Sequence, residues 1–193
     1  MKNKLSILFA LPLFMALMAI MAACSSPKTY FTSSIRNRVE NNRVPLEKIQ
    51  FYADRDIVLR RDMETGETKV NAGVVKFENG HYVNIVTLPK NTPGVCTVVK
   101  NNIVGISFEA GENKYLTFGK TKNGQPNDPY RILANDWVSD YGVINYDGKK
   151  YHIQPEGTEA AILIKTKMLK TYSIEERKMK GRTVSDKNST TGL

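Results

Sequence analysis

The sequence predicts a mainly β fold, a small antiparallel barrel or sandwich in which SH3-like units are one option, with a short helix at each end of the domain. Two dipeptides carry most of this prediction. Asn79-Gly80 and Asp147-Gly148 each lie between runs rich in β-branched and aromatic residues, and such dipeptides favour the two-residue turns of β-hairpins. Turn-forming residues also recur about every 8–12 residues along the middle of the chain, as in sandwiches and barrels.

The first 23 residues differ in composition from the rest, because 18 of them are apolar. Lys2 and Lys4 precede an apolar stretch from Leu5 to Ile20, and the small residues Ala22-Ala23 follow. This order is typical of a secretory signal peptide. The apolar stretch is shorter than the roughly 20 residues that a membrane-spanning helix needs. Without this segment the net charge of the chain falls from +9 to +7.

The run Ile20-Met21-Ala22-Ala23-Cys24 resembles the lipobox of bacterial lipoproteins, with Met21 where that motif usually has Leu. The resemblance covers residues 1–26. It implies cleavage before Cys24 and acylation of Cys24, which would anchor the mature protein in a membrane. By the same resemblance, Ser25 in place of Asp directly after Cys24 implies the outer membrane. The lack of an acidic cluster after it, which would resemble a surface-export signal, implies a domain that faces the periplasm. Cleavage that leaves an unmodified Cys24 is the alternative.

The sequence therefore predicts a signal peptide (1–23), a lipidated tether with a short helix (24–43), a β-rich domain (44–172) and a basic, partly disordered tail (173–193). Residues 25–34 are polar and lack periodicity, which is typical of a tether. The short helix is expected from Ile35 to Asn42, capped by Ser33 or Ser34.

Runs of β-branched and aromatic residues predict the strands. These runs are Ile49–Phe51, Ile57–Leu59, Val74–Phe77, Tyr82–Ile85, Val95–Val99, Ile103–Phe108, Tyr115–Phe118, Val143–Tyr146 and Tyr151–Ile153. The continuous apolar run Ala160–Ile164 predicts a strand buried on both faces. Residues 73–82 and 142–151 align without gaps, either as duplicated units or as two independent hairpins. Ser173–Glu176 fits a capping box and predicts one or two helical turns before the tail.

Few residues are available for catalysis or metal binding. His81 and His152 each lie in a predicted hairpin and lack the spacing of a zinc site, so we expect neither a metal nor a cofactor. Cys96 lies in an apolar strand, which favours a buried thiol, because a nucleophile needs a neighbouring base. A hydrolase that uses Cys96 with one of the histidines is the alternative. If Cys24 is not acylated, a Cys24–Cys96 disulfide is a further option.

Aromatic residues in the second half of the chain are candidates for a ligand-binding face. They are Tyr130, Trp137, Tyr141 and Tyr146. Aromatic rings offer flat apolar surface to a ligand, but they also fill cores and pair across strands. Asp136, Asp140 and Asp147 are a weaker candidate set of paired carboxylates, as in glycosidases, because Asp is common in turns.

Basic residues gather near both ends of the mature chain. The candidates for a membrane-facing basic surface are Arg36, Arg38, Arg43, Arg177, Lys178, Lys180 and Arg182. Anionic lipid head groups attract such residues by about 1 kcal/mol each, so a membrane surface is a candidate partner. A solvated basic face is the alternative. We do not expect nucleic acid as a partner of an exported protein.

Together these features predict a membrane-anchored envelope lipoprotein that acts as a non-enzymatic binding or accessory subunit of an envelope complex. A β-barrel that binds a lipid or glycan is the first alternative, and a small envelope hydrolase is the second. An internal cavity of about 300 Å³ or more would favour the ligand binder. A filled core with an exposed apolar patch would favour the binding subunit.

Overall fold

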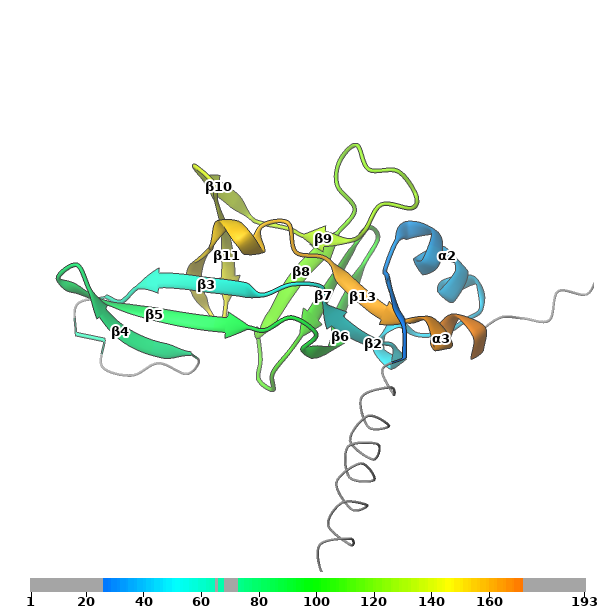
Figure 1. Ribbon diagram of the computed structural model, residues 1–193, viewed down its shortest axis with the longest axis horizontal. Coiled ribbons are helices and arrows are strands. Elements are labelled where there is room, and N and C mark those ends of the chain that lie inside the picture. Colours follow the sequence, from blue (N-terminus) through cyan, green and yellow to red (C-terminus); the bar gives the residue numbers. More distant parts are fainter. Residues whose placement is uncertain (1–25, 65, 68–72, 172–193) are drawn as a thin grey trace, which may run out of the picture.

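The computed structural model describes residues 26–64, 66–67 and 73–171, and this part of the chain is mainly β (Figure 1). Its strands form two antiparallel sheets in a sandwich-like arrangement, and neither sheet is a closed barrel. The predicted mainly β class is confirmed, and the choice between barrel and sandwich is settled in favour of the sandwich.

The first sheet has seven strands in the order β1-β13-β2-β6-β7-β8-β9. Their bounds are Lys28–Tyr30 (β1), Ile162–Lys165 (β13), Gln50–Ala53 (β2), Pro93–Lys100 (β6), Ile103–Ser107 (β7), Tyr115–Gly119 (β8) and Arg131–Ile132 (β9). Isolated bridges join Thr32 to Pro129 and Arg131 to Ala161. The sheet is therefore curled, and its two edges meet through single bridges instead of a continuous ladder.

The second sheet has six strands in the order β10-β11-β12-β3-β5-β4. Their bounds are Asp136–Val138 (β10), Tyr141–Tyr146 (β11), Lys149–Ile153 (β12), Ile57–Asp62 (β3), His81–Leu88 (β5) and Val74–Glu78 (β4). Strands β3, β5 and β4 extend away from the first sheet, toward the left in Figure 1. Strand β4 is the outermost strand of this sheet.

The two predicted Asx-Gly hairpins are present. Asn79 and Gly80 have φ values of 49° and 87° between β4 and β5, and Asp147 and Gly148 have φ values of 51° and 73° between β11 and β12. Positive φ at both central positions is what a type I′ turn requires. The hairpins belong to the same sheet, but their turns are one residue out of register in the alignment of residues 73–82 with 142–151.

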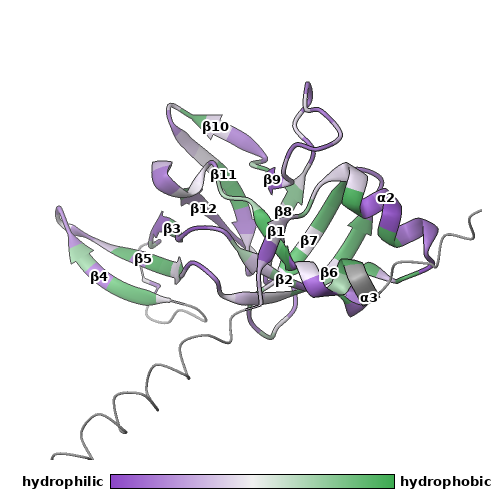
Figure 2. Ribbon diagram, turned by 45° about the vertical axis from the view of Figure 1, so that its right-hand side comes forward, coloured by the Kyte–Doolittle hydropathy of each residue, from purple (hydrophilic) through white to green (hydrophobic). Residues whose placement is uncertain are grey.

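One hydrophobic core joins both sheets. Under the first sheet, the rings of Phe31 and Phe51 pack edge to face with centroids 5.1 Å apart, and Phe31 contacts Tyr130 in the same way. Under the second sheet, alternate residues of β3 and β12 point inward, among them Leu59 and Ile153. Figure 2 shows apolar colouring on the central strands of the first sheet and also on β4, β5 and β11 of the second.

Helix α2 (Ser33–Asn41) agrees with the predicted helix, but its cap differs. The side chain of Thr32 accepts a hydrogen bond from the backbone N–H of Ile35 at 3.2 Å, so Thr32 is the N-cap and not Ser33 or Ser34. A second helix, α3 (Thr166–Thr171), follows β13. Two 3₁₀ helices complete the elements, η1 (Leu46–Lys48) and η2 (Pro155–Gly157). The helix expected after residue 173 lies outside the described residues.

Part of the predicted tether is a strand. Lys28–Tyr30 pairs antiparallel with β13, and the backbone N–H of Phe31 donates to the carbonyl of Ile162. The reason is that β13 would otherwise be the edge of the first sheet, with unpaired backbone groups. Leu163 in β13 is half-buried, so the run Ala160–Ile164 is not covered on both faces along its whole length.

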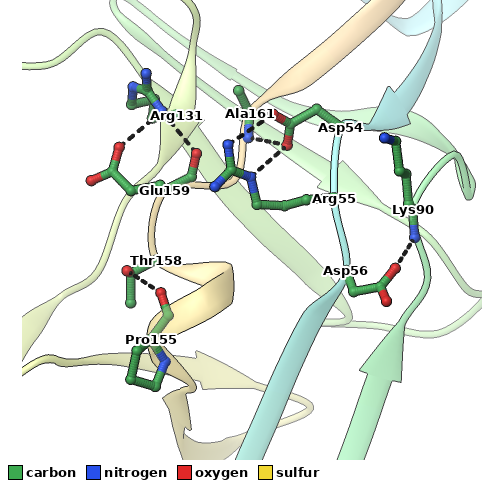
Figure 3. Close-up of polar contacts among 9 residues, drawn as sticks. All are labelled: Asp54, Arg55, Asp56, Lys90, Arg131, Pro155, Thr158, Glu159 and Ala161. Carbon is green, nitrogen blue, oxygen red and sulfur yellow. Dashed lines mark hydrogen bonds and ion pairs between the residues drawn. The ribbon is translucent and has the colours of Figure 1, made fainter.

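A polar joint fixes the path of the chain from the first sheet to the second between β2 and β3 (Figure 3). The carboxylate of Asp54 accepts a hydrogen bond from the backbone N–H of Ala161 at 2.7 Å and lies 3.4 Å from the guanidinium of Arg55. Two residues on, Asp56 accepts from the backbone N–H of Lys90 at 2.6 Å. These bonds tie residues 54–56 to the connection that precedes β13 and to the connection between β5 and β6.

Candidate interaction site

The β4–β5 hairpin exposes apolar side chains that would normally be buried. We call it the arm and define it as Val74–Leu88. The exposed fractions are 61% for Val74, 65% for Phe77 and 57% for Tyr82, and Val75 is also exposed. Phe77 and Tyr82 are paired across the hairpin, and their rings pack edge to face with centroids 5.1 Å apart. The arm thus carries an aromatic pair at its end with no cover among the described residues.

The outer edge of the arm offers backbone groups as well as side chains. Within the part of the chain that the structure describes, strand β4 has a partner on one side only, because it is last in the order of its sheet. In an antiparallel pair, alternate residues direct their N–H and C=O groups away from the partner strand. An exposed, apolar edge strand is a surface on which another strand or another protein can pair.

A row of polar side chains holds the base of the arm. On the core-side face of the sheet, Tyr151, Arg61 and Asn84 are neighbours across β12, β3 and β5. The hydroxyl of Tyr151 donates to the side-chain oxygen of Asn84, which is fully buried. The guanidinium of Arg61 lies over the Tyr151 ring, 5.5 Å from its centre. This row fixes the orientation of β5 relative to β3, so the arm leaves the sheet in a defined direction.

Arg61 also binds the segment between β3 and β4. Its guanidinium donates two hydrogen bonds to the carboxylate of Glu67, at 2.5 and 2.8 Å. Hydrogen bonding to Arg61 lowers the pKa of Glu67 to about 2, and the same bonds raise the pKa of Arg61. The pair therefore stays ionised at neutral pH, and it attaches Glu67 to the base of the arm.

The opposite face of the second sheet brings the two histidines to one polar groove of about 310 Å³. His81 Nε2 lies 3.4 Å from the carboxylate of Asp62, and the ring of His152 lies 6.4 Å from that of Tyr141, centre to centre. Arg60 of β3, beside them, forms an ion pair at 2.7 Å with Glu78 of β4, which lies on the far side of β5. No local signal in the sequence predicts this grouping, because it depends on the pairing of β12 with β3 and of β3 with β5. Within the described residues, no group of His, Cys, Asp or Glu is arranged to hold a metal ion.

A small cavity of about 170 Å³ lies between the two sheets. Its walls include Leu59, Leu88 and Leu116, and the hydroxyl of Tyr146 beside it donates to the carboxylate of Glu109 at 2.6 Å. Burial and this hydrogen bond raise the pKa of Tyr146. The volume is below the range of roughly 300–1,000 Å³ that is usual for small-molecule sites.

Cys96 has the environment of a core residue. It is buried in β6, and its thiol contacts the carbonyl oxygen of Val98 at 3.4 Å. Burial raises the pKa of Cys96 to about 11, so the thiol is protonated at neutral pH. A thiol in this state is a poor nucleophile. The expectation of a buried, structural Cys96 agrees with this environment.

The four predicted ligand-binding aromatics do not form one face. Tyr130 and Tyr146 are buried in the core, with exposed fractions of 1% and 5%. Trp137 and Tyr141 are exposed, but their side chains lie on different faces of the β10–β11 hairpin. Tyr141 pairs with Val138, the residue next to Trp137, and consecutive residues of a strand point to opposite faces. The four residues were grouped in the prediction because they are close in the sequence, but the strand pairing places them in different parts of the fold.

The predicted membrane-facing basic residues divide into two groups. Arg36 is buried and bonded to Glu40 at 2.8 Å, so its assignment to an exposed basic surface is wrong. Arg38 and Arg43 are exposed on and after α2, and the guanidinium of Arg38 donates to the carbonyl of Leu169. Cys24 and the tail residues Arg177, Lys178, Lys180 and Arg182 lie outside the described residues.

The chain matches no family model, no curated protein and no solved structure. Among the described residues, none of the helices is both long and apolar enough to cross a membrane.

Proposed function

We propose that this chain is a membrane-anchored envelope lipoprotein that acts as a non-enzymatic binding subunit, with the arm as its contact for a partner protein of the envelope. The observation that carries the proposal is the exposed pair of Phe77 on the edge strand β4 and Tyr82 on β5, where β4 has no outer partner among the described residues. Aromatic residues dominate the energy of many protein interfaces, and an edge strand adds backbone hydrogen bonds.

The interior supports this proposal over the two alternatives. The 170 Å³ cavity is smaller than a site for a lipid or glycan, which argues against a ligand-binding barrel. The buried, protonated thiol of Cys96 argues against a thiol hydrolase. The proposal therefore turns to the surface, where four of the exposed large apolar side chains of the described residues lie on the arm: Val74, Val75, Phe77 and Tyr82.

The arm is also well placed for a partner. In Figure 1 it lies at the opposite end of the molecule from α3. The carbonyl of Pro27, three residues after the proposed anchor, accepts a hydrogen bond from the backbone N–H of Thr166 at the start of α3. An anchor at one end and a contact surface at the other would present the arm away from the membrane.

The double substitution Phe77→Ser with Tyr82→Ser tests the arm. Both side chains are exposed, so the fold is expected to persist, while association with the partner should weaken at least tenfold, because losing two aromatic anchors costs about 2 kcal/mol or more. The measurement is the yield of protein crosslinked to the arm after mild detergent extraction, followed by affinity measurement with the identified partner.

Val99→Ser is the matched control, because Val99 is an exposed apolar residue on β6 of the other sheet. We expect it to leave crosslinking and affinity unchanged. Equal affinity for the double variant and the parent would overturn the assignment of the arm.

The anchor has a separate test. Cys24→Ser should abolish fatty-acid labelling of the chain, because serine lacks the thiol that is acylated. It should also leave the uncleaved precursor, visible as a larger species on a gel. If the Cys24→Ser chain is still labelled and processed, the proposed anchoring at Cys24 is wrong.

A further inference from the structure

We infer that the outer face of β1, β13 and β2 is the surface that docks on the head groups of an anionic phospholipid membrane. We call it the docking face, made by Lys28, Tyr30, Leu163, Lys165 and Tyr52. This inference rests on the proposed anchoring of the chain, and it adds which side of the domain meets the lipid.

Two lysines converge on one ring in the docking face. Lys28 and Lys165 are directly opposite each other in the β1–β13 pair. The Lys28 ammonium lies 4.3 Å from the centre of the Tyr52 ring, and the Lys165 ammonium lies 5.8 Å from it. Like charges directly opposite in a sheet repel each other, so this arrangement favours an anion that binds both.

The two ammonium groups lack acidic partners. Lys28 donates to the side-chain oxygen of Asn91 at 2.8 Å, which is a neutral acceptor. Within the part of the chain that the structure describes, neither Lys28 nor Lys165 forms an ion pair with a carboxylate. Donor capacity therefore remains for the phosphate of a lipid head group.

Apolar and aromatic side chains surround these charges. The register places Tyr30, Leu163 and Tyr52 in one row on the outer side of the sheet, next to the row of Lys28 and Lys165. Tyr30 is 43% exposed. Tyrosine is enriched where membrane meets water, and lysine stems lie along apolar surface while the charged group reaches the polar layer. This composition fits a lipid surface better than bulk water.

The docking face lies beside the point where the chain leaves toward Cys24. Pro27 directly precedes Lys28, and its carbonyl accepts a hydrogen bond from Thr166, the residue after Lys165, at 2.9 Å. Cys24 is three residues before Pro27, so the two α-carbons are at most about 11 Å apart. An acyl chain on Cys24 would therefore enter the membrane close to Lys28 and Lys165.

Cations on α2 are a poorer candidate for this role. Arg36 is buried against Glu40, and Arg38 donates to the backbone of α3. Their guanidinium groups contribute to packing within this end of the domain. The docking face instead directs its lysines outward from a sheet.

A fluorescent reporter tests the docking face in the full chain, purified from membranes and placed in vesicles. The reporter is a dye on Val95→Cys, which lies on the same side of the first sheet and is 49% exposed in the parent. A dye on Val138→Cys, 54% exposed in the second sheet, is the matched control. Quenching by a lipid with a head-group quencher is compared between phosphatidylcholine vesicles and vesicles that also contain phosphatidylglycerol.

We expect phosphatidylglycerol to increase quenching at residue 95 several-fold and to leave quenching at residue 138 unchanged. Added salt should remove the increase. Lys28→Gln with Lys165→Gln should also remove it, while Lys28→Arg with Lys165→Arg should preserve it. Equal quenching at residue 95 in both vesicles would overturn the inference, and so would an increase that both salt and the Gln variant leave intact.

The parent chain without a reporter separates this inference from the proposed anchoring. Its Cys96 is buried, so dye uptake by the parent would reveal a free thiol at Cys24 and contradict acylation. The comparison between the two vesicle types would still decide whether the docking face binds anionic lipid. Suppose that the parent takes up no dye and that the dye at residue 95 is quenched equally in both vesicle types. The inference about the docking face would then be wrong, while acylation of Cys24 would stand.

Discussion

Arg61 and Glu67 show how single residues decide the shape of the arm. The side chain of Arg61 is buried and lies between the Tyr151 ring and the Glu67 carboxylate. A buried guanidinium needs a partner, because leaving it unpaired costs several kcal/mol. Glu67 supplies that partner from the segment that leads to β4. The arm therefore depends on a bond between two residues that are six positions apart in the sequence.

Glu67→Gln should lower the free energy of unfolding at neutral pH by about 1–3 kcal/mol, because Arg61 loses its charged partner. The pKa of Glu67 is lowered to about 2 in the folded protein, from an ordinary value of 4.5. Its contribution is therefore fully present above about pH 4.5 and is lost as the pH falls toward 2. The parent should lose more stability over that interval than Glu67→Gln does.

Urea unfolding at a series of pH values measures this difference. Glu78→Gln is the control, since Glu78 pairs with Arg60 and both side chains are about one-third exposed. A pair that solvent reaches contributes less to stability than a buried pair, so this variant should stay closer to the parent than Glu67→Gln does. Identical pH dependence in the parent and Glu67→Gln would show that the pair does not stabilise the fold.

At the scale of elements, the hairpins were the most predictable part of the fold. Asn79-Gly80 and Asp147-Gly148 determine their turns locally, because both positions need positive φ and these residues tolerate it. Strands β1, β9 and β10 were not predicted. Each has only two or three residues, which is too short for an alternating pattern, and each is a strand because of the neighbour it pairs with.

Gly80→Ala tests the turn of the arm. Gly80 has a φ of 87° with open space around it, so an added methyl group meets no neighbour and only the backbone is strained. That strain costs about 1–2 kcal/mol. Since β4 is fully or partly exposed along its length, the arm should open locally while the core stays folded. Amide exchange in β4 and the start of β5 should accelerate about 5–30-fold.

Gly80→Asn is the control for this experiment, because asparagine tolerates the left-handed region far better than alanine does. Its amide exchange should stay close to that of the parent. If Gly80→Ala accelerates exchange equally in β7 and β8, the arm is not an independent unit of stability.

At the scale of the whole molecule, the candidate sites were less predictable than the fold class. The sequence could not show that His81 and His152 share a groove, that Tyr130 is in the core, or that Arg36 is buried. Each of these facts depends on pairings between segments far apart in the chain, such as His152 with Arg60. Local patterns determine turns and strands, whereas the order of strands in a sheet decides which side chains meet.

The joint between β2 and β3 links the two sheets through carboxylate hydrogen bonds to the backbone. Asp54 and Asp56 bind backbone N–H groups from two different connections (Figure 3). Such bonds to ionised carboxylates are among the stronger hydrogen bonds in proteins. They couple the second sheet, and with it the arm, to the first sheet and the docking face.

The hydrogen bond between Pro27 and Thr166 has a practical consequence for engineering the domain. It brings the beginning and the end of the described fold together at one edge of the first sheet, separated only by the short helix α3. A brief glycine-rich linker would therefore suffice to fuse these two points. New ends could then be opened in the polar loop at residues 120–129, giving a circular permutant whose strands keep all their partners.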